Sequence, residues 1–314
     1  MSDPIALVCS IDADQERRYL ASLHAAMPDE TIRPFCTLTA GQRERVRVAI
    51  VANPEPAKLA ALPRLEWMHS LWAGVERLVG ELPADAPPVV RLVDPEMSRT
   101  MAEAVLAWTY YLQRDMPAYL RQQRDATWQQ RSYRKPATLT VGVLGLGALG
   151  ATAAAKLHEA GFRVTGWSRT RKALPQIDTC SGDEGLTALL ATSDIVVSLI
   201  PLTEATRGLL DADRISAMKP GAALINFSRG PVVVTRALLA ALDSGRLSHA
   251  VLDVFDEEPL PAASPLWRHP HVTVLPHISA PTDFDTAAAI VADNVVRFRT
   301  TGAIPATVDP ARGY

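Results

Sequence analysis

The sequence predicts an α/β protein made of two doubly wound domains, each built on a parallel sheet. Short apolar runs alternate with helical stretches along most of the 314 residues, as expected when helices connect parallel strands. A glycine-rich turn follows one of these runs near the middle of the chain, at Gly145-Leu146-Gly147-Ala148-Leu149-Gly150. The 144 residues that precede this turn are enough for a separate domain.

The first half of the chain predicts one such domain. Apolar strands are expected at residues 5–9, 46–52, 65–71 and 89–93, with helices at 13–27 and 56–62. The Pro- and Ala-rich stretch 83–88 is expected to be a loop. A helix over 98–114 would then carry the chain into the second domain, because apolar residues recur there every three or four positions.

The second half alternates more regularly. Strands are expected at 139–144, 162–167, 194–200, 222–227, 249–254 and 272–275, with helices at 149–160, 205–218 and 235–244. A final helix at 281–301 carries one apolar stripe, so it needs a packing partner. Thr282 and Asp285 have the spacing of a capping box at its start.

Residues 121–135 form a basic segment around Trp128. We expect an exposed connector, with an anion-binding or subunit contact as the alternative.

The composition excludes several classes of protein. A hydrophobic content of 48% and a charged content of 21% are typical of globular proteins. The net charge of −2 gives no reason to expect nucleic acid or an anionic membrane as a partner. Three cysteines without metal or redox spacing suit a reducing compartment. With no apolar leader and no apolar run of membrane-spanning length, we expect a cytoplasmic protein.

The glycine-rich turn indicates a dinucleotide site. Gly145 permits the tight turn, Gly147 lets a pyrophosphate approach the backbone, and Gly150 lets the helix pack closely on the strand. Ala148 and Leu149 lead into the predicted helix 149–160, whose N-terminus would present free N–H groups to phosphate. The alternative is a glycine-rich turn without a ligand.

The next strand indicates which dinucleotide binds. An NAD site usually has a carboxylate about 20 residues after the turn, for the ribose 2′-hydroxyl. No acidic residue occurs between Glu159 and Asp178, and hydroxyls and cations stand there instead: Ser168, Arg169, Thr170, Arg171 and Lys172. These groups suit a 2′-phosphate, so we predict NADP(H) rather than NAD(H). The alternative is a basic solvated loop.

Three later loops carry chemistry at the ends of predicted strands. Arg229, Glu258 and His277 each follow an apolar run, and the carboxyl ends of parallel strands border one crevice. These loops would bring a cation, a carboxylate and an imidazole to one place. His277 can donate a proton near neutral pH, Glu258 would fix its tautomer, and Arg229 can bind and polarise an anionic group.

These residues carry a family resemblance. The glycine turn, Ser198–Thr203, Thr206-Arg207-Gly208, Arg229-Gly230, Glu258–Pro261 and Pro276-His277-Ile278 resemble the D-isomer-specific 2-hydroxyacid dehydrogenase family, in order. The intervals also agree, with 29 residues from Arg229 to Glu258 and 19 to His277. Within the family, the glyoxylate/hydroxypyruvate reductase A branch is most similar, through Ser70–Val75, Trp167–Arg169, Pro265–Trp267 and Ala280–Asp283.

The resemblance implies a flavodoxin-like substrate domain (1–98 with 284–314), a Rossmann nucleotide domain (99–283) and a homodimer. It implies NADPH-dependent reduction of glyoxylate to glycolate and of hydroxypyruvate to D-glycerate. Ala73 and Gly74 would hold the substrate carboxylate through their backbone, while Pro201, Thr206 and Asp253 would contact the cofactor. Trp72 and Trp267 are expected to line the substrate pocket, with a place in the core as the alternative for each. For Asp253 the alternative to a cofactor contact is that it caps the end of a strand.

Two departures and two rival functions stay open. The chain has Pro231-Val232 where the family often has Val-Asp, and a bulky Trp72 where the family has a smaller residue. One rival is reduction of another 2-keto acid such as phenylpyruvate, and the other is a dinucleotide-sensing, corepressor-like binding protein. His269 and His271 lack a third ligand, so we expect solvated loop histidines and no metal.

Overall fold

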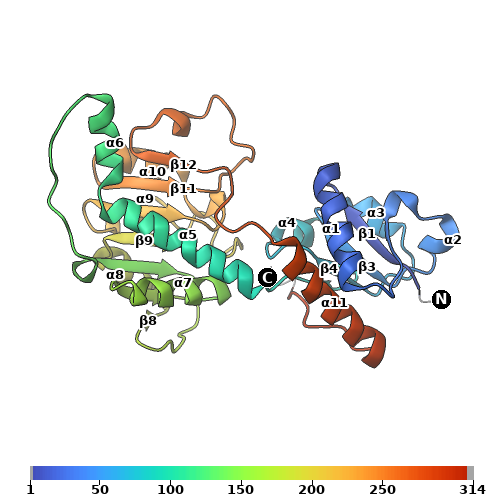
Figure 1. Cartoon of the computed structure of the whole chain (residues 1–314). Coiled ribbons are helices and arrows are strands. Elements are labelled where there is room, and N and C mark those ends of the chain that lie inside the picture. Colours follow the sequence, from blue (N-terminus) through green and yellow to red (C-terminus); the bar gives the residue numbers. More distant parts are fainter. Residues whose placement is uncertain (1–2, 310–314) are drawn as a thin grey trace. The chain divides into compact units, whose positions relative to one another are not determined.

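A computed structural model describes residues 3–309 (Figure 1). The chain divides into two compact units. Unit 1 contains the residues up to Glu96 together with the segment from Thr282 onward, and unit 2 is Met97–Pro281. Within residues 3–309, no helix combines the length and the apolar character that crossing a bilayer requires.

Unit 1 is built on a five-stranded parallel sheet with strand order β2-β1-β3-β4-β5. The strands are β1 (Ile5–Cys9), β2 (Ile32–Pro34), β3 (Val48–Ala52), β4 (Trp67–Ser70) and β5 (Val89–Val90). This is the flavodoxin-like order, which confirms the predicted fold class for the first half. The sequence did not predict β2, a three-residue edge strand that ends in proline.

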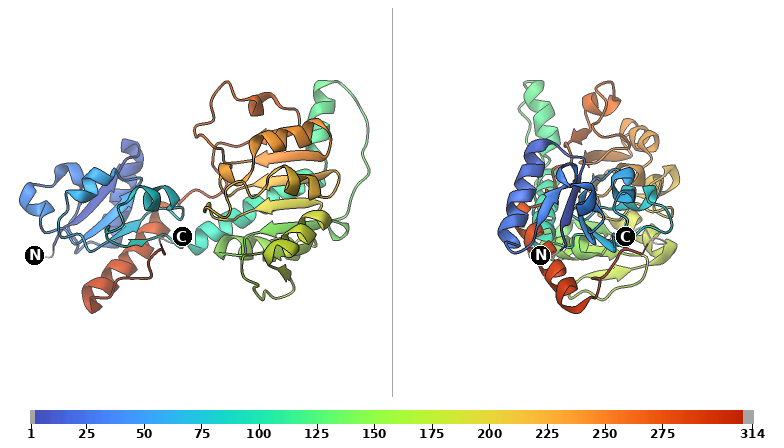
Figure 2. Two further views of the ribbon diagram at one scale, coloured as in Figure 1. Left: turned by 180° about the vertical axis from the view of Figure 1, so that it is seen from behind. Right: turned by 90° about the vertical axis from the view of Figure 1, so that its right-hand side faces the viewer.

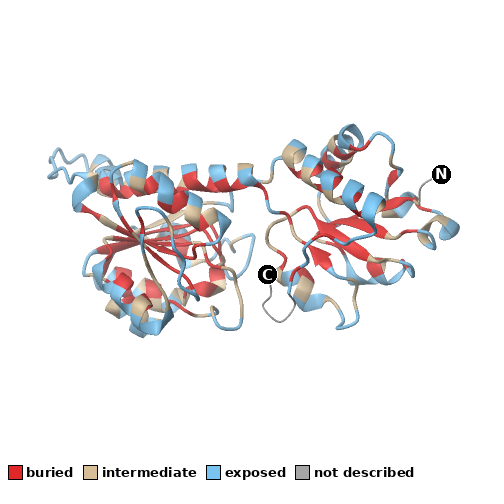
Figure 3. Cartoon of the chain, turned by 90° about the horizontal axis from the view of Figure 1, so that it is seen from below, coloured by how far each residue is buried: buried red, intermediate tan, exposed pale blue. Residues whose placement is uncertain are grey.

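Both faces of this sheet are buried, and alternate strand residues serve different cores. Ile5, Leu7 and Ile50 pack with α1 (Ala13–Ala26) and α11 (Phe284–Thr301). Ala6, Val8 and Val51 face the other way, toward α3 (Pro56–Ala60) and α4 (Glu76–Glu81). In Figure 3 the strands are accordingly red, while the outer sides of the helices are pale blue. A short helix, α2, spans Ala40–Arg43.

Helix α11 completes the core of unit 1. Its apolar stripe, Ala288, Val291, Val295 and Phe298, is buried, as the sequence predicts. The predicted capping box is wrong: the N-cap is Asp283, whose carboxylate accepts bonds from the Asp285 and Thr286 N–H groups at 3.1 and 2.9 Å. Aspartate is among the best N-cap residues, so it outcompetes the neighbouring threonine.

Unit 2 is built on a seven-stranded parallel sheet with order β12-β11-β10-β9-β6-β7-β8 (Figure 2). The strands are β6 (Thr140–Leu144), β7 (Arg163–Trp167), β8 (Asp178–Cys180), β9 (Ile195–Ser198), β10 (Ala222–Asn226), β11 (Leu247–Leu252) and β12 (Val272–Val274). The strand order reverses between β6 and β9. In such sheets ligands bind beyond the carboxyl ends of the strands at this reversal.

Helices cover both faces of the larger sheet. Helices α5 (Pro95–Gln113) and α7 (Ala148–Glu159) bury one core, and α8 (Gly182–Thr192), α9 (Ala212–Ala217) and α10 (Thr235–Asp243) bury the other. Helix α8 was not predicted from the sequence. The predicted helix 205–218 is wrong in its first half, because only Ala212–Ala217 is helical. Helix α6 (Met116–Arg124) occupies the start of the basic segment, and an exposed extended loop follows it.

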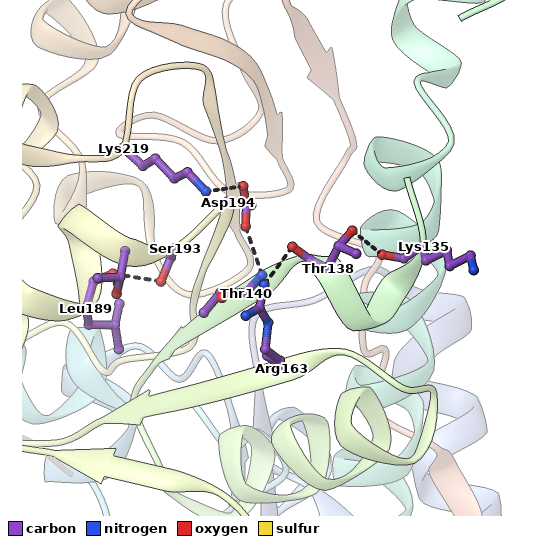
Figure 4. Close-up of polar contacts among 9 residues, drawn as sticks. Lys135, Thr138, Thr140, Arg163, Leu189, Ser193, Asp194 and Lys219 are labelled. Atoms are coloured by element: carbon purple, nitrogen blue, oxygen red, sulfur yellow. Dashed lines mark hydrogen bonds and ion pairs between the residues drawn. The ribbon is translucent and has the colours of Figure 1, made fainter. Parts of the chain in front are cut away.

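Ion pairing fixes the amino ends of β6 and β9 (Figure 4). The Asp194 carboxylate accepts a bond from the Thr140 N–H at 2.9 Å and pairs with Lys219 at 2.7 Å. The adjacent Ser193 hydroxyl donates to the Leu189 carbonyl at 2.7 Å. These contacts stabilise the amino ends of the strands, whereas the ligand position expected for such a sheet is at their carboxyl ends.

Candidate active site

The glycine turn joins β6 to α7 at the reversal of strand order. Gly145 has a φ of +96°, which favours glycine, and a Cβ added to it would lie 2.8 Å from the Leu199 carbonyl oxygen. A Cβ added at Gly150 would lie 1.7 Å from the Gly145 carbonyl oxygen. The fold itself therefore requires both glycines.

Gly147 differs from these two residues. An added Cβ there would meet no protein atom within 4 Å, and Gly147 and Ala148 are exposed at the start of α7. The open backbone suits a ligand that approaches the helix N-terminus closely, and N–H groups at such an end favour phosphate. The turn therefore fits the pyrophosphate of a dinucleotide.

The loop after β7 holds the hydroxyls and cations predicted for a 2′-phosphate. The buried Ser168 hydroxyl donates to the Thr170 carbonyl at 2.8 Å, which shapes the loop. Arg169 and Arg171 are exposed. The Lys172 ammonium donates to the Leu146 carbonyl at 2.6 Å and so ties the loop to the glycine turn. No pattern in the sequence predicts this contact between Lys172 and the glycine turn.

The segment after β9 is a compact turn in place of the predicted helix. The Thr206 hydroxyl donates to the Pro201 carbonyl at 2.6 Å and accepts a bond from the Thr203 N–H at 2.8 Å. These side-chain bonds satisfy the backbone without a helix. They bring Pro201 and Thr206, both predicted cofactor contacts, to one turn.

Glu258 and His277 meet at the carboxyl edge of the same sheet. The Nδ1 atom of His277 lies 2.7 Å from Oε2 of Glu258, and Oε1 of Glu258 accepts a bond from the Phe255 N–H at 2.9 Å. About half of the His277 side chain, 52%, is exposed. Because Nδ1 faces the carboxylate, Nε2 is the nitrogen left for a substrate.

The pair sets the charge of both groups. The bond from Glu258 raises the pKa of His277 above its ordinary value, against the opposing effects of burial and of the Arg229 charge. Burial opposes ionisation of Glu258, but the bonds from His277 and Phe255 prevail and lower the pKa of its carboxyl. The two groups therefore favour an imidazolium beside a carboxylate, which is the protonation state of an acid catalyst.

Asp253 fixes the backbone around His277. Its buried carboxylate accepts bonds from the Ile278 and Ser279 N–H groups at 2.7 and 2.9 Å. His277 itself has a φ of +52°, in the left-handed region that costs energy for a residue with a side chain. The two bonds hold the loop in that conformation. The contacts observed for Asp253 are thus with the histidine loop.

Arg229 lies between β10 and a short helical turn at Gly230–Val232, and its charge acts on both His277 and Glu258. Its guanidinium Nη1 donates to the Ser228 carbonyl at 2.6 Å. The next residue, Gly230, packs on the backbone of the Glu258 loop: an added Cβ would lie 2.0 Å from the carbonyl carbon of Phe255. The missing side chain lets the two loops approach.

The predicted pocket residues lie in both units. In unit 1 the loop that contains Trp72, Ala73 and Gly74 follows β4, and all three residues are partly exposed. The Ser70 hydroxyl donates to the Trp72 carbonyl and accepts from its N–H, both at 3.0 Å. In unit 2 Trp267 is 49% exposed, and its indole N–H donates to the Pro261 carbonyl at 3.0 Å.

The histidines at 269 and 271 are hydrogen-bonded to each other and to nearby residues. The expectation of a solvated loop residue is wrong for His269, whose side chain is 9% exposed and bonds to Asp243 at 3.1 Å. Its Nδ1 accepts the His271 N–H at 3.1 Å, and His271 bonds to the Ser248 carbonyl. Across residues 3–309, no three His, Cys, Asp or Glu side chains are grouped to hold a metal.

Sequence comparison places this arrangement among known proteins. The profile of the NAD-binding domain of D-isomer-specific 2-hydroxyacid dehydrogenases matches residues 106–279. The chain is 35% identical over 307 residues to a glyoxylate/hydroxypyruvate reductase A from Yersinia enterocolitica, covering 96% of this chain and 97% of the relative.

Two solved structures are similar to this chain in fold over its full length. A D-isomer-specific 2-hydroxyacid dehydrogenase from Xanthobacter autotrophicus Py2, in complex with NADPH and MES, has a TM-score of 0.92, 42% identity and complete coverage of both chains. An NADPH-dependent glyoxylate/hydroxypyruvate reductase from Sinorhizobium meliloti, with NADP and sulfate, has a TM-score of 0.91 at 31% identity, again covering both chains completely.

Proposed function

The chain belongs to the D-isomer-specific 2-hydroxyacid dehydrogenase family, and we propose that it is an NADPH-dependent reductase of glyoxylate and hydroxypyruvate. The products are glycolate and D-glycerate. The observation that carries the proposal is the Glu258–His277 pair, because it holds a proton donor at the same sheet edge as a glycine turn suited to a dinucleotide. Similarity along the whole chain to reductases of these two substrates supports the choice of substrate.

We propose the following roles for the site residues. When bound, NADPH supplies the hydride for the carbonyl carbon. His277 gives the proton on Nε2 to the carbonyl oxygen, and Glu258 holds Nδ1 so that this proton points to the substrate. Arg229 binds the substrate carboxylate and draws charge onto the carbonyl oxygen. Proton transfer by a placed side chain contributes about 10²–10⁴-fold to the rate.

Other residues complete the proposal. The N–H groups at Ala73 and Gly74 bind the substrate carboxylate, and Trp72 and Trp267 limit substrate size. Gly145, Gly147, Ala148, Leu149 and Gly150 bind the pyrophosphate, and Pro201, Thr206 and Asp253 contact the cofactor. We assign substrate binding to residues 1–98 with 284–314 and nucleotide binding to residues 99–283. The division into units 1 and 2 falls two residues earlier at each boundary. Three unpaired cysteines support a cytoplasmic location, which cell fractionation would check.

Steady-state kinetics tests the function. Glyoxylate and hydroxypyruvate are each assayed with NADPH and with NADH, beside phenylpyruvate. We expect turnover of the two small acids with NADPH preferred. Preference for phenylpyruvate would overturn the substrate, and NADPH binding without oxidation by any 2-keto acid would favour the binding-protein alternative.

Cofactor preference depends on the loop after β7. Replacing Arg169 with Asp is expected to weaken NADPH binding by about 10- to 100-fold, because a charge-assisted contact becomes a repulsion. NADH binding should change far less, since it lacks the 2′-phosphate. Fluorescence titration measures both, and Arg297→Asp, an exposed change on α11, is the control. Equal losses for the two cofactors would contradict the assignment.

We also propose a homodimer in which the loop after α6 contacts the second copy. In that loop Trp128 is 97% exposed and Tyr133 is 62% exposed, which is unusual for large aromatic residues. Such residues are commonly buried at protein–protein interfaces. Light scattering should give twice the chain mass for the wild type. The Trp128→Glu variant should give the mass of one chain. A dimeric Trp128→Glu variant would exclude this loop as the contact, and a monomeric wild type would exclude the dimer.

A further inference from the structure

Three buried polar side chains form a hydrogen-bonded chain that reaches the backbone of Arg229. Ser198 ends β9, Asn226 ends β10, and the two residues are paired in the register of the sheet. Ser228 stands one residue before Arg229. The three are 0%, 1% and 5% exposed, respectively. Burying a polar group costs free energy unless that group is hydrogen-bonded. The three side chains are therefore expected to form hydrogen bonds within the fold.

The hydroxyl protons of this network have one consistent arrangement. The Ser228 hydroxyl donates to Oδ1 of Asn226 at 2.7 Å, and the Ser228 N–H also donates to that oxygen at 3.2 Å. The hydroxyl oxygens of Ser198 and Ser228 are 2.9 Å apart. Ser228 has a single hydroxyl proton and uses it on Asn226. Ser198 must therefore be the donor in the remaining contact.

The network ends on Arg229 in two ways. The Asn226 side-chain amide donates to the Arg229 carbonyl at 3.1 Å, which closes the turn from 226 to 229. The Arg229 guanidinium donates to the carbonyl of Ser228, the residue that Ser198 and Asn226 hold. The chain of bonds therefore fixes both the backbone of Arg229 and the group on which its guanidinium rests.

We propose that Ser198 and Asn226 are positioning residues for Arg229 in the reduction of a small 2-keto acid. Asn226 shapes the loop from within its own strand, and Ser198 anchors it to the neighbouring strand β9. The inference rests on the proposed role of Arg229 in binding the substrate carboxylate. A displacement of the guanidinium would weaken that contact without affecting the glycine turn.

Ser198→Ala isolates this effect, because it removes one donor and leaves the bonds among Asn226, Ser228 and Arg229 in place. We expect kcat/KM for glyoxylate to fall by about tenfold, mainly through KM, with the NADPH dissociation constant unchanged. Ser193→Ala removes another fully buried serine hydroxyl, which lies just before the amino end of β9, whereas Ser198 is at its carboxyl end. This control variant (Figure 4) should leave kcat/KM unchanged.

The decisive measurement is made in the Arg229→Lys background. If Ser198 acts through Arg229, Ser198→Ala should cost less than about twofold there, because the guanidinium it positions is gone. The same tenfold loss in both backgrounds, or no loss in the wild type, overturns the inference. If Ser198→Ala fails to fold, Ser228→Ala removes the contact with Ser198 together with the hydroxyl bond to Asn226, and it is judged by the same criteria. An inactive wild type would refute the proposed function instead.

Discussion

Replacing His277 with glutamine is expected to lower kcat for glyoxylate reduction by about 10²–10⁴-fold, since the side chain can still bond but cannot supply a proton. NADPH affinity should be unchanged, because the observed contacts of His277 are with Glu258 and not with the glycine turn. Loss of the reduced-nicotinamide absorbance in a single turnover measures the chemical step directly. A variant with more than a tenth of wild-type kcat would exclude His277 as the acid.

Glu258→Gln is the companion variant for this test. The acid form of His277 is lost as pH rises through its pKa, which Glu258 holds above the ordinary value of 6.5. Without the carboxylate that pKa falls, so the alkaline decline of kcat/KM should move to lower pH. His277→Gln should remove this decline. An unchanged profile in Glu258→Gln would mean that another group controls the proton.

Gly230→Ala is expected to lower kcat/KM by about 10²-fold, although it adds only one methyl group. The new Cβ would lie 2.0 Å from the Phe255 carbonyl carbon and 2.4 Å from the Asp256 nitrogen, so the loop of Arg229 must move away from that of Glu258. These contacts are with backbone, which cannot rotate aside. Kinetics with glyoxylate measures the loss, and thermal unfolding measures the cost of overpacking, about 1–3 kcal/mol.

Gly80→Ala provides the matched control. An added Cβ at Gly80, in α4, meets no atom within 4 Å, so this substitution should leave kinetics unchanged. Near-normal kcat/KM in Gly230→Ala would show that the separation of the two loops does not matter for the reaction.

Much of the fold follows from patterns that act locally. Buried parallel strands require continuous apolar runs, so the strands of unit 2 are visible in the sequence apart from β8. The edge strands β2 (Ile-Arg-Pro) and β8 (Asp-Thr-Cys) contain charged and polar residues, so they show no apolar run in the sequence. Helix α8 begins with glycine and contains another, which hides a helix that forms because its leucines are buried in the core.

The site was partly predictable for a similar reason. Arg229, Glu258 and His277 follow predicted strands of one sheet, so topology alone brings them to one edge. The bond between Ser198 and Ser228 depends on the register of β9 against β10, which no local pattern contains. The Lys172 contact with Leu146 likewise depends on how two loops fold beside each other.

The buried stripe of α11 also has a consequence for biosynthesis. The strands β1, β3 and β4 leave the ribosome before unit 2, but the residues that finish their core, from Ala288 to Phe298, are translated after it. All of unit 2 is translated in between, as an uninterrupted stretch that can fold as it emerges. The sheet of unit 1 therefore remains incomplete on one face until unit 2 has been translated.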